Sequence, residues 1–173
     1  MTINCLSLSS INEKAPYHVW SANGISFSFQ TETDVVYGVS FVEDHMISDD
    51  GDVMQLIISV NEGEASQKDF KIQSTVIAIL EEFFKTGWAT LVYICDTRDG
   101  RQSSRQRLFS IWFSLYPEKD KYVHEYKELQ IDGIGYYMAL LGRKDNPLLP
   151  EQLDSFEQLF QQISGKESNL SAV

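Results

Sequence analysis

The residue types best suited to chemistry gather in one stretch of the chain, residues 95–113, which reads CDTRDGRQSSRQRLFSIWF. It holds four arginines and two aspartates: Arg98, Arg101, Arg105, Arg107, Asp96 and Asp99. A guanidinium group binds a carboxylate or a phosphate through two parallel hydrogen bonds. It cannot serve as a general base, because it stays protonated at physiological pH. The stretch therefore favours recognition of an anion over catalysis.

The position of this stretch supports the same interpretation. The apolar run LVYIC predicts a buried strand, and Gly100 predicts a tight turn into a helix that begins near Arg101. Helix N-termini attract anions through their N–H groups and the helix dipole. Helical spacing puts two arginines and three apolar residues on one stripe: Arg101, Arg105, Leu108, Phe109 and Trp112. We therefore expect both guanidinium groups to point inward. Each cation in the first turns costs about 0.3–1 kcal/mol, which an acid or a bound anion must offset.

Two explanations of these charged residues stay open. In the structural one, Asp99 caps the helix and Asp96 pairs with Arg101 or Arg105. In the functional one, the strand–helix junction at residues 95–105 is a pocket for a small anion. Its binding residues are then Asp96, Asp99, Gly100, Arg101 and Arg105. We predict a non-catalytic binding or interaction domain whose partner is a small anion or a protein. We assign no cofactor and no catalytic residue, and the question of enzyme activity stays open.

Other features support weaker hypotheses. The acidic loop at residues 43–52, EDHMISDDGD, is interpreted as a solvated hairpin tip, because it lacks the ligand spacing of a calcium loop. His124 lies on an alternating strand and would act as a base only if that face lined a cleft. The two cysteines and three histidines have no metal-ligand spacing, so no metal site is predicted. The tryptophans are predicted to anchor the core: Trp20, Trp88 and Trp112.

The overall charge limits the classes of partner. The chain has 173 residues with 14 bases and 25 acids, which give a formal net charge of −11. This acidity argues against nucleic-acid binding and against adhesion to anionic membranes. No apolar run reaches the ~18 residues of a membrane span, and the start, MTINCLSLSS, has no signal-peptide pattern, so we expect a cytoplasmic protein. The amphipathic last helix either covers the core or joins two copies in a homodimer.

Hydrophobic periodicity predicts the order of the elements. Alternating and apolar runs predict strands at residues 17–22, 25–30, 35–42, 53–60, 89–95, 122–131 and 134–141. Three- and four-residue spacing predicts helices at residues 69–86, 101–116 and 148–163. The pairs Asn23-Gly24 and Asp132-Gly133 have the composition of two-residue hairpin turns. These elements predict an α+β fold with a single mixed, largely antiparallel sheet and helices on both faces.

The same pattern predicts the domain organisation. We expect one domain at residues 17–165, an irregular N-terminal arm at residues 1–16 and a frayed C-terminal tail at residues 166–173.

Three runs carry a family resemblance: CDTRDGRQSSRQRLFSIWF, the upstream FKIQSTVIAILEEFF and the late YYMALLGRKDNP. Through them the chain resembles an uncharacterised family of small Bacteroidota proteins, a domain of unknown function. The resemblance implies a bacterial intracellular protein and brings no activity with it.

The order of elements over residues 17–142 also resembles the acyl-CoA N-acyltransferase fold of the GNAT superfamily. This resemblance implies an alternative function, a CoA-dependent N-acetyltransferase that binds acetyl-CoA where the fourth strand meets the long helix. The chain departs from that family in two places. Only Gly63 and Ala65 echo the glycine-rich loop, and the glutamates flanking them would repel a pyrophosphate. Phe109 stands where the family's general-acid tyrosine is expected.

Overall fold

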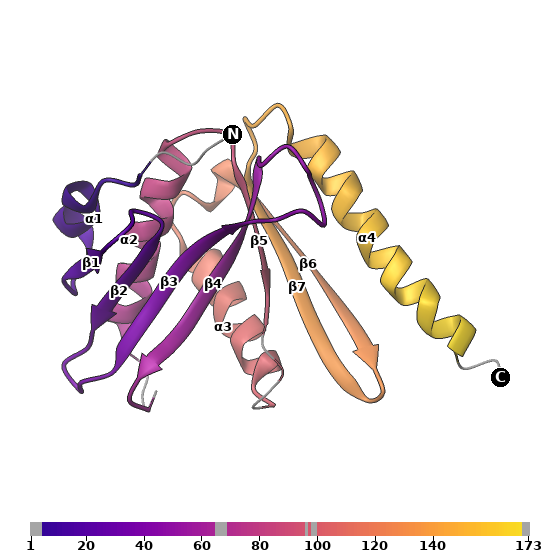
Figure 1. Ribbon diagram of the computed structural model, residues 1–173, viewed down its shortest axis with the longest axis horizontal. Coiled ribbons are helices and arrows are strands. Elements are labelled where there is room, and N and C mark those ends of the chain that lie inside the picture. Colours follow the sequence, from indigo (N-terminus) through magenta and orange to yellow (C-terminus); the bar gives the residue numbers. More distant parts are fainter. Residues whose placement is uncertain (1–4, 65–68, 96, 98–99, 171–173) are drawn as a thin grey trace. The chain divides into compact units, whose positions relative to one another are not determined.

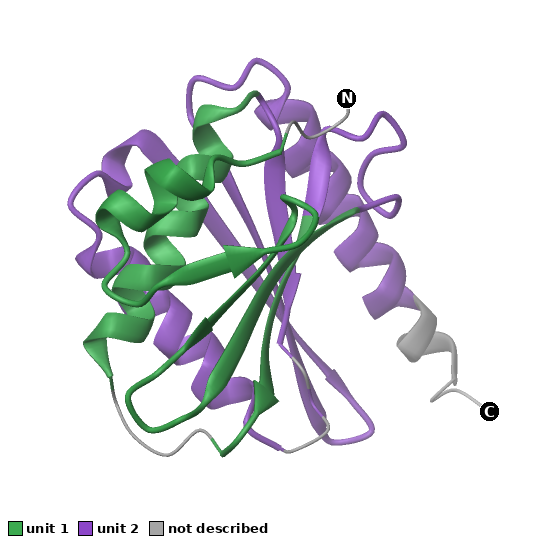
Figure 2. Ribbon diagram, turned by 60° about the vertical axis from the view of Figure 1, so that its left-hand side comes forward, with its two compact units in different colours: residues 1–43, 55–87 green, residues 44–54, 88–173 purple. Residues whose placement is uncertain are grey.

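The fold is known from a computed structural model, which describes residues 5–64, 69–95, 97 and 100–170, without the side chains of residues 166–170. Seven strands and four α-helices in this part of the chain confirm the α+β class. The chain divides into two compact units, residues 1–43 with 55–87 and residues 44–54 with 88–173 (Figure 2). This division does not test the prediction of one domain at residues 17–165.

The first unit combines neighbouring strands with two helices. Its strands lie in the order β1 (Val19–Ser21), β2 (Ser26–Gln30), β3 (Val36–Glu43) and β4 (Val53–Glu62) (Figure 1). Most of β4 belongs to this unit, and its first two residues belong to the second. β1 pairs antiparallel with β2, and β2 pairs antiparallel with β3. Its helices are α1 (Leu8–Lys14) and α2 (Phe70–Lys85). An ion pair of 2.6 Å between Lys14 Nζ and Glu81 Oε2 joins α1 to α2.

α2 forms as the apolar spacing predicts, and it supplies much of the core of the first unit. Val76, Ile79 and Phe83 recur at three- and four-residue intervals, and each is at most 2% exposed. The ring of Phe83 stacks on Phe41 of β3 with 4.6 Å between the ring centroids. The helix is therefore held by burial of one whole face against the strands.

The second unit is a three-stranded antiparallel arrangement with a helix on each face. Its strands lie in the order β5 (Thr90–Ile94), β7 (Ile134–Arg143) and β6 (Tyr122–Ile131). Its helices are α3 (Gln102–Leu115), the short 3-10 turn η1 (Lys119–Lys121) and α4 (Leu149–Leu170). Tyr93 of β5 contacts Phe109 of α3. Val92, the residue before Tyr93, packs in one cluster with Phe156 of α4. Because successive strand residues point to opposite faces, α3 and α4 cover opposite sides of these strands (Figure 1).

Both predicted hairpins form, with one difference in turn chemistry. Asp132 and Gly133 take positive φ angles of 50° and 78° between Ile131 and Ile134, which pair across the turn. In the first hairpin Gly24 takes a φ of 74°, and Asn23 instead accepts a 2.8 Å hydrogen bond on its side-chain oxygen from the N–H of Ser26. The side-chain carbonyl of Asn23 thus closes a longer turn than the two-residue one predicted.

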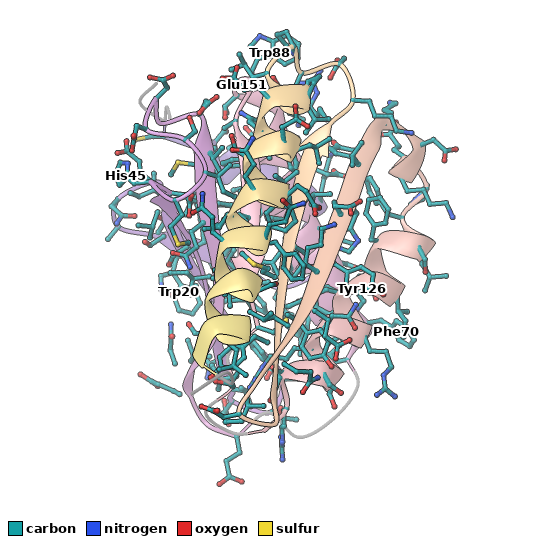
Figure 3. The ribbon with its side chains drawn as sticks, turned by 90° about the vertical axis from the view of Figure 1, so that its right-hand side faces the viewer. Trp20, His45, Phe70, Trp88, Tyr126 and Glu151 are labelled. Atoms are coloured by element: carbon teal, nitrogen blue, oxygen red, sulfur yellow. The ribbon has the colours of Figure 1, made fainter. Side chains whose placement is uncertain are left out.

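Three expectations about the ends and the core are wrong. The arm at residues 1–16 was expected to be irregular, but α1 occupies Leu8–Lys14 and its Ile11 is fully buried. α4 continues to Leu170, beyond the predicted end at residue 163 and into the tail expected to fray. Trp20 and Trp88 are 43% and 38% exposed, so these two indoles are not core anchors. Trp88 lies near the start of α4 (Figure 3), where its backbone oxygen accepts a 2.8 Å hydrogen bond from Nδ2 of Asn146. The guanidinium of Arg143 stacks on its ring at 5.0 Å.

Candidate functional site

α3 begins at a basic N-cap residue that does not itself cap the helix. Its N-cap is Arg101, whose side chain makes no capping hydrogen bond, and its first turn holds no acidic residue. Gly100 has a φ of 69°, as the predicted turn requires, and glycine adopts this left-handed conformation without strain. The first N–H groups of an α-helix have no partner within the helix. This end of α3 therefore has the polarity that attracts an anion.

Arg105 lies one turn further along α3 and close to the thiol of Cys95, just after β5. Burial raises the pKa of the Cys95 thiol to about 11, although the nearby charge of Arg105 acts in the opposite direction. Arg105 is half-buried, whereas Arg101 and Leu108 are exposed. The expected inward orientation is thus wrong for Arg101, because this residue precedes the first helical turn. It is also wrong for Leu108, which is exposed, whereas Phe109 of the same predicted stripe does contact the sheet.

Gln102, the first residue of α3, adds a polar group to this junction. Within the described ranges, its Oε1 is the buried side-chain oxygen that has no hydrogen-bond partner. A buried acceptor without a partner costs about 1–3 kcal/mol. A bound molecule that donates a hydrogen bond to Gln102 would recover part of this free energy.

The two aspartates predicted to complete the site, Asp96 and Asp99, lie outside the described residues, as does Arg98. Helix capping by Asp99 and pairing of Asp96 with an arginine therefore remain predictions. Arg101 and Arg105 both interact with other parts of the chain.

An aromatic cluster lies beneath the middle of α3. The hydroxyl of Tyr93 and Nε2 of His124 are 2.7 Å apart. The rings of Phe109 and Phe113 contact Tyr93 and His124, with centroid distances of 5.2 Å and 4.8 Å. Burial lowers the pKa of His124 and raises the pKa of Tyr93 far above its usual value. The neutral imidazole and the neutral phenol are therefore the stable forms at physiological pH.

The sequence analysis singled out His124 but missed Tyr93. The available signal was the alternation of β5, which puts Tyr93 on the face opposite Val92. The pairing of β6 with β7 and of β7 with β5 then brings His124 to the same face as Tyr93. Only the strand order reveals this neighbourhood, because 31 residues separate the two side chains in sequence.

The acidic loop is folded on itself, and its interpretation as a solvated hairpin tip is wrong for two carboxylates. Asp44 is 3% exposed and accepts 3.0 Å hydrogen bonds from the N–H groups of Met46 and Ile47. Asp52 is 8% exposed and accepts a 2.8 Å hydrogen bond from Nε2 of Gln152 on α4. In the part of the chain that the structure describes, no cluster of three or more histidine, cysteine or acidic residues could hold a metal ion.

The loop where the GNAT resemblance places acetyl-CoA is only partly described, because residues 65–68 lie outside the description. Gly63 has a φ of 82°, and a Cβ there would lie 3.2 Å from Cα of Val35, so tight packing of the backbone accounts for this glycine. The helix that follows is capped by Asp69, whose carboxylate accepts a 2.8 Å hydrogen bond from the N–H of Lys71. A carboxylate therefore already occupies the helix end where a pyrophosphate would bind.

The comparisons with known proteins identify a family for this chain but give no function. A family model described as a family of unknown function (DUF6169) matches residues 68–158. The match covers more than half of the chain, so the chain belongs to this family. No curated protein and no solved structure matches it. Among the described helices, none combines the length and apolarity needed to cross a membrane.

Proposed function

We propose, for this member of a family of unknown function, a non-catalytic binding module that takes a small anion at the start of α3. The ligand is a carboxylate or a phosphate held by Arg101, Arg105 and the first N–H groups of the helix. The observation that carries the proposal is the half-buried Arg105, one turn into a helix whose N-cap residue Arg101 makes no capping hydrogen bond and whose first turn, among the described residues, holds no acid.

The ionisable groups near this junction argue against catalysis. A reactive cysteine has a lowered pKa, whereas the pKa of Cys95 is raised to about 11, so the thiol stays protonated at neutral pH. His124 and Tyr93 are hydrogen-bonded to each other within an aromatic cluster, and burial favours the neutral form of each. These shifts move each group away from the pKa near 7 that suits a nucleophile or a general base.

The arginines are suited to binding even though both already interact with the rest of the chain. A guanidinium has five N–H donors, so one group can contact the protein and an anion together. A contact that orients a side chain before the ligand arrives reduces the entropy lost on binding.

The test is titration of the protein with inorganic phosphate. Calorimetry measures the heat of binding, and the melting temperature measures the stabilisation. We expect phosphate to raise the melting temperature of the wild type. Arg105→Met should abolish this rise, and Arg101→Met should reduce it. Lys144→Met is the matched control, because Lys144 is an exposed base that follows the far end of β7 from the junction. The charge-retaining variant Arg105→Lys keeps the test valid if Arg105→Met does not fold.

Three outcomes would count against this function. Phosphate that never stabilises the wild type would make the charged cluster purely structural. Equal loss in Lys144→Met would reduce the effect to general charge screening. Binding of acetyl-CoA that phosphate does not compete with would favour the acetyltransferase alternative.

A further inference from the structure

The side of α3 that faces away from its strands carries a row of exposed apolar residues. Leu108, Ile111 and Leu115 follow one another at three- and four-residue spacing and are 41%, 47% and 65% exposed. This spacing puts them on one stripe of the helix. No residue of α3 is fully buried. We call the stripe, together with Arg107 next to it, the outer face of α3.

The charge around this row has the opposite sign to the rest of the protein. Residues 101–121 contain five bases and two acids, while the whole chain has 14 bases and 25 acids. Arg107 is exposed beside Leu108. Beyond the other end of the row, Nζ of Lys119 donates a 2.7 Å hydrogen bond to the carbonyl oxygen of Ser114. The apolar row therefore lies between two bases.

We propose that the outer face of α3 docks an acidic amphipathic helix of another protein. Apolar residues of the partner would cover Leu108, Ile111 and Leu115, and acidic residues at the edges of its apolar stripe would pair with Arg107 and Lys119. Packing of two helix stripes removes apolar surface from water, and the charges set the orientation and increase the association rate. This inference is independent of the anion site, which lies at the start of the same helix.

Two other occupants fit the charges less well. A second copy that packed its own α3 against this one would bring arginines of the same sign together across the contact. A membrane surface attracts amphipathic helices that carry a cluster of about four to eight bases. The apolar row of α3 is flanked by two, Arg107 and Lys119. The test below makes each of these a separate outcome.

The experiment uses two labelled synthetic peptides, one amphipathic helix of leucine and glutamate and its counterpart with every glutamate replaced by lysine. We expect the full-length protein to bind the glutamate peptide in fluorescence anisotropy and to bind it more weakly as salt is raised. Ile111→Glu and Leu115→Glu should each weaken binding by about tenfold or more, as for central residues of an interface. Arg107→Glu should weaken it less, mainly through the association rate.

Leu148→Glu is the matched control, because Leu148 is 38% exposed and lies outside α3. Its affinity for the glutamate peptide should equal that of the wild type, and circular dichroism should show that all variants are folded. The proposal is overturned if both peptides bind equally well or if neither binds. It is also overturned if the protein binds phosphatidylserine vesicles but not the glutamate peptide, or if Ile111→Glu dissociates a dimer of the wild type.

Discussion

The two helices α2 and α3 begin in opposite ways. The N-terminus of α2 is closed by Asp69, whose carboxylate accepts hydrogen bonds from the N–H of Lys71 and from the hydroxyl of Tyr17. The N-terminus of α3 follows Arg101, which provides no side-chain cap. An acid at a helix start is stabilising, and a base there is destabilising. The comparison indicates that α2 is built for stability and that the start of α3 is suited to receive a negative charge.

The helices also differ in how they are held. α2 buries seven residues, including Ile79 and Phe83, whereas α3 buries none completely. α3 instead places half-buried aromatic rings, Phe109 and Phe113, over Tyr93 and His124. Elements with few buried apolar contacts open more easily than core elements. A binding function is thus more compatible with α3 than with α2. We expect mutations on the two helices to have clearly different effects on stability.

The largest expected effect is on the core side of α2. Phe83→Ala should lower the free energy of unfolding by about 3–5 kcal/mol, because the ring is 2% exposed and its removal leaves a cavity. Phe109→Ala on α3 should lower it by about 1–2 kcal/mol, since that half-buried ring removes less apolar surface from water. Urea unfolding of both variants checks the difference, and equal losses would contradict the contrast in packing.

A smaller effect is expected at the helix starts. Asp69→Ala should destabilise the protein by about 1 kcal/mol, because it removes the N-cap of α2. Arg101→Ala should leave stability unchanged or raise it by about 0.3–1 kcal/mol, because it removes a cation from the start of α3. Asp69→Asn is the control, since asparagine keeps the cap and gives up only the hydrogen bond from Tyr17, so it should lose less stability than Asp69→Ala. A loss in Arg101→Ala as large as that in Asp69→Ala would show that Arg101 has a structural role.

The smallest expected effect is a dependence of the free energy of unfolding on pH, caused by His124, which packs against α3. Burial lowers the pKa of His124 in the folded protein, while an unfolded histidine titrates near pH 6.5. Below about pH 6.5 the unfolded state therefore binds more protons, and stability falls as the pH decreases through the folded pKa. His124→Gln should lack this component, so the wild type should lose more stability than the variant on acidification. Urea unfolding at neutral and mildly acidic pH measures the difference, and parallel losses would argue against it.

Much of the fold could be predicted from local patterns. The turn at Asp132-Gly133, the helix over Phe70–Lys85 and the alternation of the strands follow from residue types within a few positions of one another. The GNAT-like order of the elements stays a prediction, because no solved structure matches the chain. At the candidate site, the sequence predicted a turn at Gly100, whose φ is 69°, and a helix that begins near Arg101, which is the N-cap of α3.

The expectations that are wrong share a physical cause. Trp20 and Trp88 are assigned to the core on hydrophobicity alone, but both indoles stay partly exposed, and the guanidinium of Arg143 lies over the ring of Trp88. The carboxylates of Asp44 and Asp52 were assigned to solvent on charge alone, but hydrogen bonds satisfy both of them in a buried loop. Burial depends on the partners that folding provides, which no single position specifies.

The amino-acid order by itself determined most of the turns and most of the helices and strands, although not α1. It also determined that the chain carries an excess of acid and that four of its five arginines lie in residues 98–107. These properties depend on backbone sterics and on residues a few positions apart. The tertiary structure alone decided that Tyr93 meets His124, that Arg105 lies beside Cys95, and that Leu115 stays exposed. Such contacts join residues from different elements, so they exist only after the strands have paired and the helices have packed on them.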